Sequence, residues 1–151
     1  MSVTSTCRPA TDRDLPALLD MEALFPGDRM TRRSWRALLR NPRARVWVID
    51  NDAGMVCANL VCLSRCDTHW WRVYSVVVHP EARGRGLARR LIQAVMNAAT
   101  VADAAGLRLE VRDDNVAARA LYATLGFELR GLRPGYYDDG ATAVQLQWRA
   151  V

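Results

Sequence analysis

Residues 73–99 read VYSVVVHPEARGRGLARRLIQAVMNAA, and this stretch decides the fold. It opens with Val73–Val78, a run rich in β-branched residues that predicts a strand. From Leu87 to Ala102 apolar residues recur at helical spacing, which predicts an amphipathic helix. The segment between them, Arg83–Ala88, therefore joins a strand to the N-terminus of a helix.

This loop has the composition of an anion-binding site. A helix N-terminus presents backbone N–H groups and the positive end of the helix dipole, and both favour an anion. Gly84 and Gly86 lack the Cβ atoms that would hold a phosphate away from the backbone, and Arg83, Arg85 and Arg89 add positive charge. Arg89 stands where the dinucleotide motif GxGxxG has its last glycine, and the Walker motif needs a lysine, which the chain lacks.

The regions on both sides of this stretch predict further strands and helices. The order of elements is β-α-α-β-β-β-α-β-α-β-β, which predicts a mixed α/β (α+β) fold: one central mixed sheet flanked by about four helices, in a single domain over residues 1–151. We expect Gly106 to end the long helix. The other expected elements are a strand at 3–8, a helix from Thr11 or Asp12 to Glu22, a helix from Thr31 to Asn41, strands at 46–49 and 55–66, a strand at 107–111, a helix at 115–125, and strands at 127–132 and 143–148.

Composition bounds the class of protein. Of the 151 residues, 50% are hydrophobic and 25% charged, which suits one globular domain rather than a disordered chain. No run approaches the roughly 20 apolar residues of a membrane span, and the N-terminus lacks the features of a signal peptide. We therefore expect a soluble cytoplasmic protein with no membrane partner.

All basic residues are arginines: 21 of them against 16 acidic residues, for a net charge of +5. A guanidinium suits phosphate and carboxylate, so the partner could be nucleic acid, an acidic polypeptide or a phosphorylated cofactor. Seven arginines fall between Arg29 and Arg45. They form either a solvated helix face opposite Trp35, Leu38 and Leu39, or a surface that attracts an acidic peptide or ribosomal RNA.

The cysteines do not predict a metal site. Cys57, Cys62 and Cys66 with His69 match no usual zinc spacing, and strand alternation points Cys57 away from the other two. We expect no metal, and thiols, including that of Cys7, that behave as small buried apolar groups.

With its flanking strand and helix, Arg83–Ala88 resembles the pyrophosphate loop R/Q-x-x-G-x-G/A of the GNAT superfamily of acetyl-CoA-dependent N-acetyltransferases. Ala88 stands where glycine is commoner. The resemblance covers nearly the whole chain and implies the GNAT fold with acetyl-CoA as co-substrate. The cofactor-binding residues that it implies are Val76, Val77, Val78, Arg83, Gly84, Arg85, Gly86, Leu87, Ala88, Arg89 and Asn115.

The C-terminal half, with Leu109-Glu110-Val111-Arg112, Asn115, Ala120-Leu121-Tyr122 and Leu125-Gly126-Phe127, is similar to the ribosomal-protein-alanine N-acetyltransferase (RimI-like) group. That likeness implies direct attack by an amine, with Glu110 as proton acceptor and Tyr122 as proton donor. The implied acceptor is a protein N-terminus, with a ribosomal protein possible, and the implied substrate-binding residues are Phe25, Tyr136 and Tyr137. Residues 25–35 look more like a side branch of the group, which leaves the acceptor unassigned.

Each of these residues also has a purely structural interpretation. Glu110 could pair with Arg108 or Arg112, Tyr122 could be a core aromatic, and Asn115 could cap the helix that follows it. His79 is expected to be a loop residue before Pro80 rather than a general base.

Two other functions stay open. The acceptor could be the amine of a small molecule or peptide metabolite, because one fold serves many acceptors. A non-catalytic domain could instead sense acyl-CoA or bind nucleic acid. No helix-turn-helix, RNP-type strand or zinc finger is visible, so no direct nucleic-acid function is expected.

Overall fold

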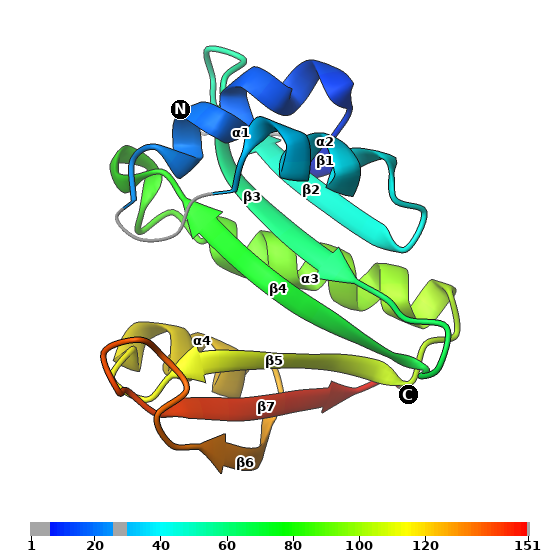
Figure 1. The fold of residues 1–151 in the computed structure, drawn as a ribbon, viewed down its shortest axis with the longest axis vertical. Helices are drawn as coiled ribbons and strands as arrows, with labels where there is room; N and C mark the ends of the chain where they lie inside the picture. Colours follow the sequence, from blue (N-terminus) through cyan, green and yellow to red (C-terminus); the bar gives the residue numbers. More distant parts are fainter. Residues whose placement is uncertain (1–6, 26–29, 151) are drawn as a thin grey trace. The chain divides into compact units, whose positions relative to one another are not determined.

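The computed structural model describes residues 7–25 and 30–150. Hydrogen bonds order its seven strands as β1-β2-β3-β4-β5-β7-β6 in one mixed sheet (Figure 1). The elements are β1 Cys7–Pro9, η1 Asp12–Asp14, α1 Leu15–Glu22, α2 Arg32–Arg40, β2 Ala44–Asp50, β3 Val56–Leu63, β4 Trp70–Val78, η2 Pro80–Ala82, α3 Leu87–Val101, β5 Gly106–Arg112, α4 Val116–Thr124, β6 Glu128–Arg133 and β7 Ala143–Arg149. This order confirms the predicted mixed α/β class, with four α-helices and two 3-10 turns in the described ranges.

The chain forms two compact units. Unit 1 comprises residues 1–63 and 75–95, and unit 2 comprises residues 64–74 and 96–151. The division falls inside β4 and α3, so each unit contains part of both elements. Each unit is described by itself.

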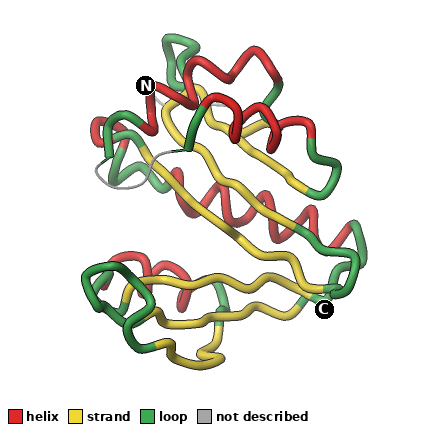
Figure 2. The backbone as a smooth tube through the Cα atoms, viewed as in Figure 1, coloured by secondary structure: helices red, strands yellow, loops and turns green. Residues whose placement is uncertain are grey.

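Unit 1 is built on β2 and β3, which pair antiparallel (Figure 2). Helices α1 and α2 pack against them through a cluster that includes Leu18, Trp35 and Val48, each at most 1% exposed. Six consecutive residues of β3, Cys57–Cys62, are buried, as expected of a strand covered on both faces. Trp35 is buried whereas the arginines of α2, Arg32–Arg40, are exposed, as both interpretations of this arginine run require.

Two strand ranges in unit 1 differ from the prediction. Residues 3–6 of the strand expected at 3–8 lie outside the described ranges, and β1 extends to Pro9, an edge position where the missing N–H is tolerated. The strand expected at 55–66 is shorter, because the chain turns at Cys66–Asp67. Cys57 and Cys62 are buried, but Cys7 is half-buried and Cys66 exposed, so the prediction of buried thiols is wrong for Cys66.

Unit 2 is built on β5, which alternates in burial. Leu107, Leu109 and Val111 are buried, whereas Arg108, Glu110 and Arg112 lie on the other face. Along its length β5 pairs antiparallel with β7, and Trp70–Arg72 of β4 pairs parallel with Gly106–Arg108. We call the face that carries Arg108, Glu110 and Arg112 the polar face of unit 2.

Gly106 does not end the preceding helix as predicted. Helix α3 stops at Val101, Asp103 takes the left-handed conformation (φ 60°), and Gly106 is the first residue of β5 (φ 155°). A Cβ on Gly106 would overlap the backbone oxygen of Trp148 and lie 2.9 Å from the ring of Trp70. Glycine is needed here because two neighbouring strands approach the backbone closely.

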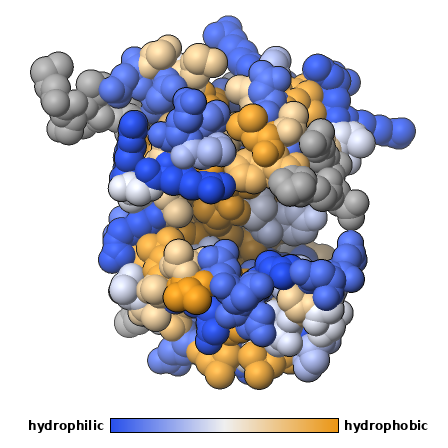
Figure 3. Space-filling model, turned by 90° about the vertical axis from the view of Figure 1, so that its left-hand side faces the viewer, coloured by the Kyte–Doolittle hydropathy of each residue, from blue (hydrophilic) through white to orange (hydrophobic). Residues whose placement is uncertain are grey.

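The surface is mixed in character. The face drawn in Figure 3 carries hydrophilic residues interrupted by smaller hydrophobic areas. Within residues 7–25 and 30–150 no helix has the length and apolarity needed to cross a membrane.

Replacing Gly106 should destabilise the fold strongly. Gly106→Ala places a methyl group against the backbone of β7, and we expect it to lower the free energy of unfolding by about 3 kcal/mol, measured by urea denaturation. Gly135→Ala is the matched control, because Gly135 has φ 67° with no atom within 4 Å of an added Cβ. The control should lose about 1 kcal/mol. Equal losses in the two variants would contradict the close approach at Gly106.

Candidate functional site

In unit 1 the turn that follows β4 is held by His79. Its backbone N–H donates to the Cys57 carbonyl (2.8 Å), and its Nδ1 accepts a hydrogen bond from the Glu81 N–H (3.1 Å). His79 thereby caps the short 3-10 turn Pro80–Ala82, and buried Ala82 anchors that turn. This confirms the interpretation of His79 as a loop residue.

The loop that follows leaves its backbone open to a ligand. Gly84 and Gly86 adopt positive φ angles of 80° and 74°, and a Cβ on either would meet no protein atom within 4 Å. Arg83 and Arg85 are exposed, whereas Leu87 is buried and anchors the start of α3. The Arg90 N–H donates to the Gly86 carbonyl (3.1 Å), so the helix begins directly at the glycines.

This geometry fits an anionic group. The first turn of an α-helix has N–H groups without intrahelical carbonyl partners, and here it follows two left-handed glycines with exposed arginines beside them. An added methyl group at Gly84 or Gly86 would take up space that is open in the protein and through which a phosphate would approach.

Two other predicted regions lie in unit 1. The guanidinium of Arg83 stands 5.9 Å from the ring centre of Phe25, so the structure brings a predicted substrate residue beside a predicted cofactor residue. Val76, Val77 and Val78 are half-buried at the end of β4. Pro26–Arg29, part of the segment expected to mark a side branch of the family, lie outside the described ranges.

In unit 2 Glu110 is held by an arginine of the neighbouring strand. Its side chain is 16% exposed, and its Oε2 lies 3.2 Å from Nη2 of Arg72. The same Nη2 donates a hydrogen bond to the Tyr136 hydroxyl (3.2 Å). The prediction that Glu110 pairs with Arg108 or Arg112 is wrong. Arg112 pairs with Asp114 and Asp139 instead. Because β4 pairs parallel with β5, Arg72 lies close enough to Glu110 to be its partner.

Sequence analysis missed Arg72 because it started the strand at Val73. The signal was present in the alternation of Trp70–Tyr74, where Trp71 and Val73 are buried and Arg72 and Tyr74 are exposed. Extending the strand to Trp70 would have placed Arg72 within it.

The two predicted acceptor tyrosines lie beside Glu110. Their rings contact edge to face, with centres 5.1 Å apart. Arg112 lies 5.0 Å from the ring centre of Tyr137 and binds Asp139 at 2.6 Å, which ties this loop to β5. Burial, together with the neighbouring Tyr136 and the charge of Glu110, raises the pKa of the Tyr137 phenol. Glu110, Tyr136 and Tyr137 therefore form one cluster in unit 2.

Asn115 and Tyr122 belong to α4. Asn115 caps the helix, its side-chain oxygen accepting from the Ala118 N–H (3.1 Å), as its structural interpretation predicted. Tyr122 is 8% exposed and packs edge to face on Phe127, 5.4 Å between ring centres. Burial raises the pKa of Tyr122 to about 12, so its phenol keeps its proton at neutral pH. In the part of the chain described, no hydrogen bond joins either residue to Glu110.

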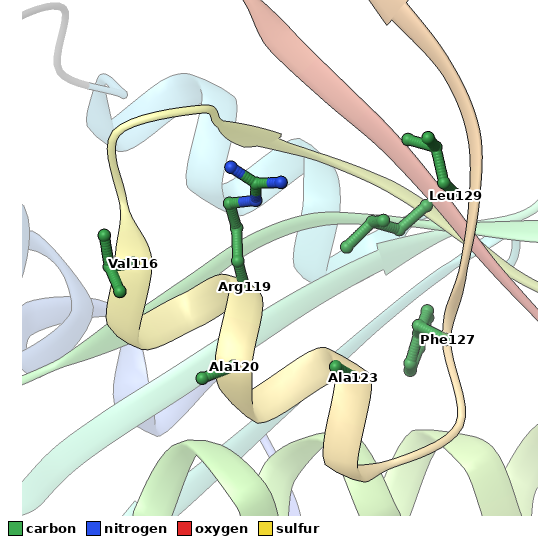
Figure 4. Close-up of a pocket in the computed structure, with 7 residues that line it drawn as sticks. Val116, Arg119, Ala120, Ala123, Phe127 and Leu129 are labelled. Carbon is green, nitrogen blue, oxygen red and sulfur yellow. The ribbon is translucent and has the colours of Figure 1, made fainter.

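An apolar groove runs along α4 that sequence analysis did not predict (Figure 4). It measures about 420 Å³ and lies within unit 2. Its lining residues are Val116, Arg119, Ala120, Ala123, Phe127, Leu129 and Leu146. Val116 and Leu129 are 74% and 66% exposed, so its rim is apolar and open.

Metal chemistry finds no support in the ranges described. No three His, Cys, Asp or Glu side chains there could together hold a metal ion. Burial raises the pKa of the Cys62 thiol to about 12. Burial is also the largest of the effects that raise the pKa of the Cys57 thiol. These thiols are therefore poor metal ligands and poor nucleophiles at neutral pH.

Comparison with known proteins identifies a family and several relatives. Residues 13–127 match the Acetyltransferase (GNAT) family. A Bacillus subtilis protein, provisionally named ribosomal protein bS18-alanine N-acetyltransferase, is 27% identical over 152 residues, covering 100% of this chain and 99% of its own length. The Mycobacterium tuberculosis N-alpha-acetyltransferase RimI is 39% identical over 91 residues, covering 60% of this chain and 56% of its own length.

The similarity extends to solved structures. The crystal structure of the Escherichia coli ribosomal-protein-S18-alanine N-acetyltransferase matches with a TM-score of 0.86 at 24% identity, covering 98% of this chain and 96% of that one, which shows the shared fold. Apart from the Bacillus subtilis protein, the match spans between 22% and 56% of the length of the other curated relatives compared.

The buried phenol of Tyr122 should make the fold sensitive to alkali. Because its pKa is raised from 10.0 to about 12 in the folded chain, the unfolded chain ionises first. Stability is therefore unaffected below pH 10 and falls as the pH rises from 10 through 12. Urea denaturation across this range should show a loss about 3 kcal/mol larger for the wild type than for Tyr122→Phe. Equal slopes for the two proteins would contradict burial of the phenol.

Proposed function

Because this chain belongs to the GNAT acetyltransferase family, an N-acetyltransferase family, we propose that it transfers an acetyl group from acetyl-CoA to the α-amine of a protein N-terminus. The observation that carries this proposal is the cluster on the polar face of unit 2. There a partly buried Glu110 is oriented by Arg72, which also binds Tyr136. These contacts support a role for Glu110 as proton acceptor, beside an aromatic pair able to contact a peptide.

The first chemical requirement is a neutral amine. An α-amine has an ordinary pKa of about 7.7–8.0, so it is largely protonated at neutral pH and must lose a proton before it attacks. Glu110 accepts this proton, directly or through a water molecule. Its ion pair with Arg72 holds the carboxylate in one orientation, so no rearrangement is needed at the moment of transfer.

Acetyl-CoA supplies the activated acetyl group, and unit 1 carries the residues that fit it. The loop Arg83–Arg89 provides helix N-terminal N–H groups and arginines for the pyrophosphate. Backbone N–H groups at Val76–Val78 would donate to the thioester oxygen and the pantetheine arm. Asn115, which caps α4, would also contact acetyl-CoA.

The leaving group requires a proton donor. Tyr122 carries its phenolic proton at neutral pH, as an ordinary tyrosine does, and we assign it as the group that donates a proton or a hydrogen bond to the departing thiolate of coenzyme A. No covalent enzyme intermediate is needed, in keeping with the raised pKa values of the buried cysteines.

The named relatives support a class of acceptor. The Bacillus subtilis and Escherichia coli proteins are both named as ribosomal protein alanine N-acetyltransferases. We propose an alanine-starting protein N-terminus as the acceptor.

Amine-dependent release of thiol from acetyl-CoA tests this function. A peptide copying an alanine-starting ribosomal N-terminus should support release, and the same peptide with a blocked amine should not. Glu110→Gln should lower kcat at least about 100-fold while acetyl-CoA binding measured by calorimetry stays the same. Glu128→Gln, an exposed carboxylate of β6, is the matched control and should retain full turnover. If acetyl-CoA binds but no release occurs, the tested N-terminus is not the acceptor, and a small-molecule amine becomes the next candidate.

The glycine loop predicts a separable defect in acetyl-CoA binding. Gly86→Ala should raise the Kd for acetyl-CoA at least about tenfold, because the methyl group blocks close approach of the pyrophosphate. Gly54→Ala is the control, since Gly54 has φ 79° and equally open surroundings in the same unit. Both variants should lose about 1 kcal/mol of stability. An unchanged Kd in Gly86→Ala would remove the loop from the binding site.

A further inference from the structure

A second group of charged residues lies on the polar face of unit 2, at the end opposite the tyrosine cluster. The guanidinium of Arg108 stacks 4.1 Å from the ring centre of Trp70, and that of Arg149 lies 5.0 Å from the same ring. Burial lowers the pKa of Arg108, and the nearby charges of Arg130 of β6 and Arg149 lower it further. Arg108, Arg130, Arg149 and Trp70 are called the arginine shelf.

Among the described residues the arginine shelf has no counter-charge. No carboxylate in these ranges lies within ion-pair distance of Arg108, Arg130 or Arg149, although Glu128 is on the neighbouring strand. The Nε of Arg108 is buried and has no hydrogen-bond partner there. A buried donor without an acceptor is costly, and so are two like charges around one ring.

Two other arginines of the same face have carboxylate partners. Arg72 binds Glu110, and Arg112 binds both Asp114 and Asp139. Abundance of arginine in the chain therefore does not by itself leave guanidinium groups unpaired here. The shelf is the part of this face where an incoming anion would gain most, because it would satisfy charges that the protein leaves without a partner.

The register of unit 2 fixes the distance from the shelf to the proposed proton acceptor. Arg108 precedes Glu110 by two residues on the same face of β5, about 7 Å away along the strand. Gly106 precedes Arg108 by two more residues, and Arg149 of β7 lies opposite it. Arg149 is therefore about 13 Å from Glu110 along the strand direction. An extended peptide advances about 3.3 Å per residue. A peptide whose amine lies at Glu110 and whose chain runs along β5 toward Gly106 would pass the shelf with about its third to fifth residues.

We propose that the arginine shelf binds acidic side chains at the third to fifth positions of the acceptor, so that the enzyme selects protein N-termini with a carboxylate-rich segment there. This inference rests on the proposed N-terminal acetylation. The planar guanidinium groups bind the carboxylates of the incoming segment, and Trp70 supplies a flat surface for its chain.

Paired peptides test this selectivity. Two alanine-starting acceptors differ only in carrying glutamate or glutamine at positions three to five. The wild type should show kcat/KM at least about tenfold higher for the glutamate peptide, mainly through KM. The double variant Arg130→Gln/Arg149→Gln should lose most of this preference while turnover of the glutamine peptide stays the same. Arg108 is left unchanged because it packs on Trp70.

The double variant Arg32→Gln/Arg36→Gln is the charge-matched control, since it removes two exposed arginines from α2 in unit 1. It should keep the wild-type preference for the glutamate peptide. Equal loss in both double variants would mean that net charge alone attracts the peptide, and that result overturns the shelf.

A binding measurement separates this inference from the proposed function. The glutamate peptide with a blocked amine and a fluorescent label is titrated with protein by anisotropy, which needs no turnover. Binding by the wild type that weakens about five- to tenfold in Arg130→Gln/Arg149→Gln supports the shelf even if neither peptide is acetylated. If the glutamate peptide does not bind, the proposed role of the arginine shelf is wrong. It is also wrong if a labelled uridine oligonucleotide binds more tightly than the peptide and the same double variant abolishes that binding.

Discussion

The close approach of three backbone segments at Gly106 fixes the geometry of unit 2. The Ala105 N–H donates to the His69 carbonyl (2.7 Å), and the Ala150 N–H donates to the Ala105 carbonyl (2.9 Å). With no Cβ at Gly106, the ring of Trp70 lies against the backbone of β5. In the resulting register Arg72 of β4 lies opposite Arg108 of β5, and Glu110 follows two residues later on the same face of β5. Glu110 therefore takes its ion-pair partner from the neighbouring strand.

Arginine is suited to this arrangement in a way that lysine is not. A guanidinium has five N–H donors in a fixed plane, so one side chain is able to hold two partners at once. Arg72 does so for Glu110 and Tyr136, and Arg8 does so in unit 1 for Asp14 and Asp50. The arginine-only composition thus has structural consequences in both units, whatever caused it.

The sequence predicted the elements well because their signals are local. Leu87–Val101 shows helical spacing, Asn115 is a typical cap, and Gly84 and Gly86 have the positive φ angles that a tight turn requires. Features that depend on pairing between strands were missed. Arg72 as partner of Glu110, the role of Gly106 and the arginine shelf all follow from the β4–β5–β7 register, which has no local signature.

The contrast between paired and unpaired arginines separates two roles on one sheet face. Around Glu110, Arg72 and Arg112 each bind a carboxylate, which holds the proposed proton acceptor in place and ties the tyrosine loop to β5. Around Trp70, the guanidinium groups of Arg108 and Arg149 face the aromatic ring, and no carboxylate of the described residues pairs with them. Cation–π contacts are worth about 0.5–2 kcal/mol, which holds the guanidinium groups in place without neutralising their charge. Such an arrangement leaves a positive potential that attracts an external anion, whereas a carboxylate of the protein at the same place would neutralise it.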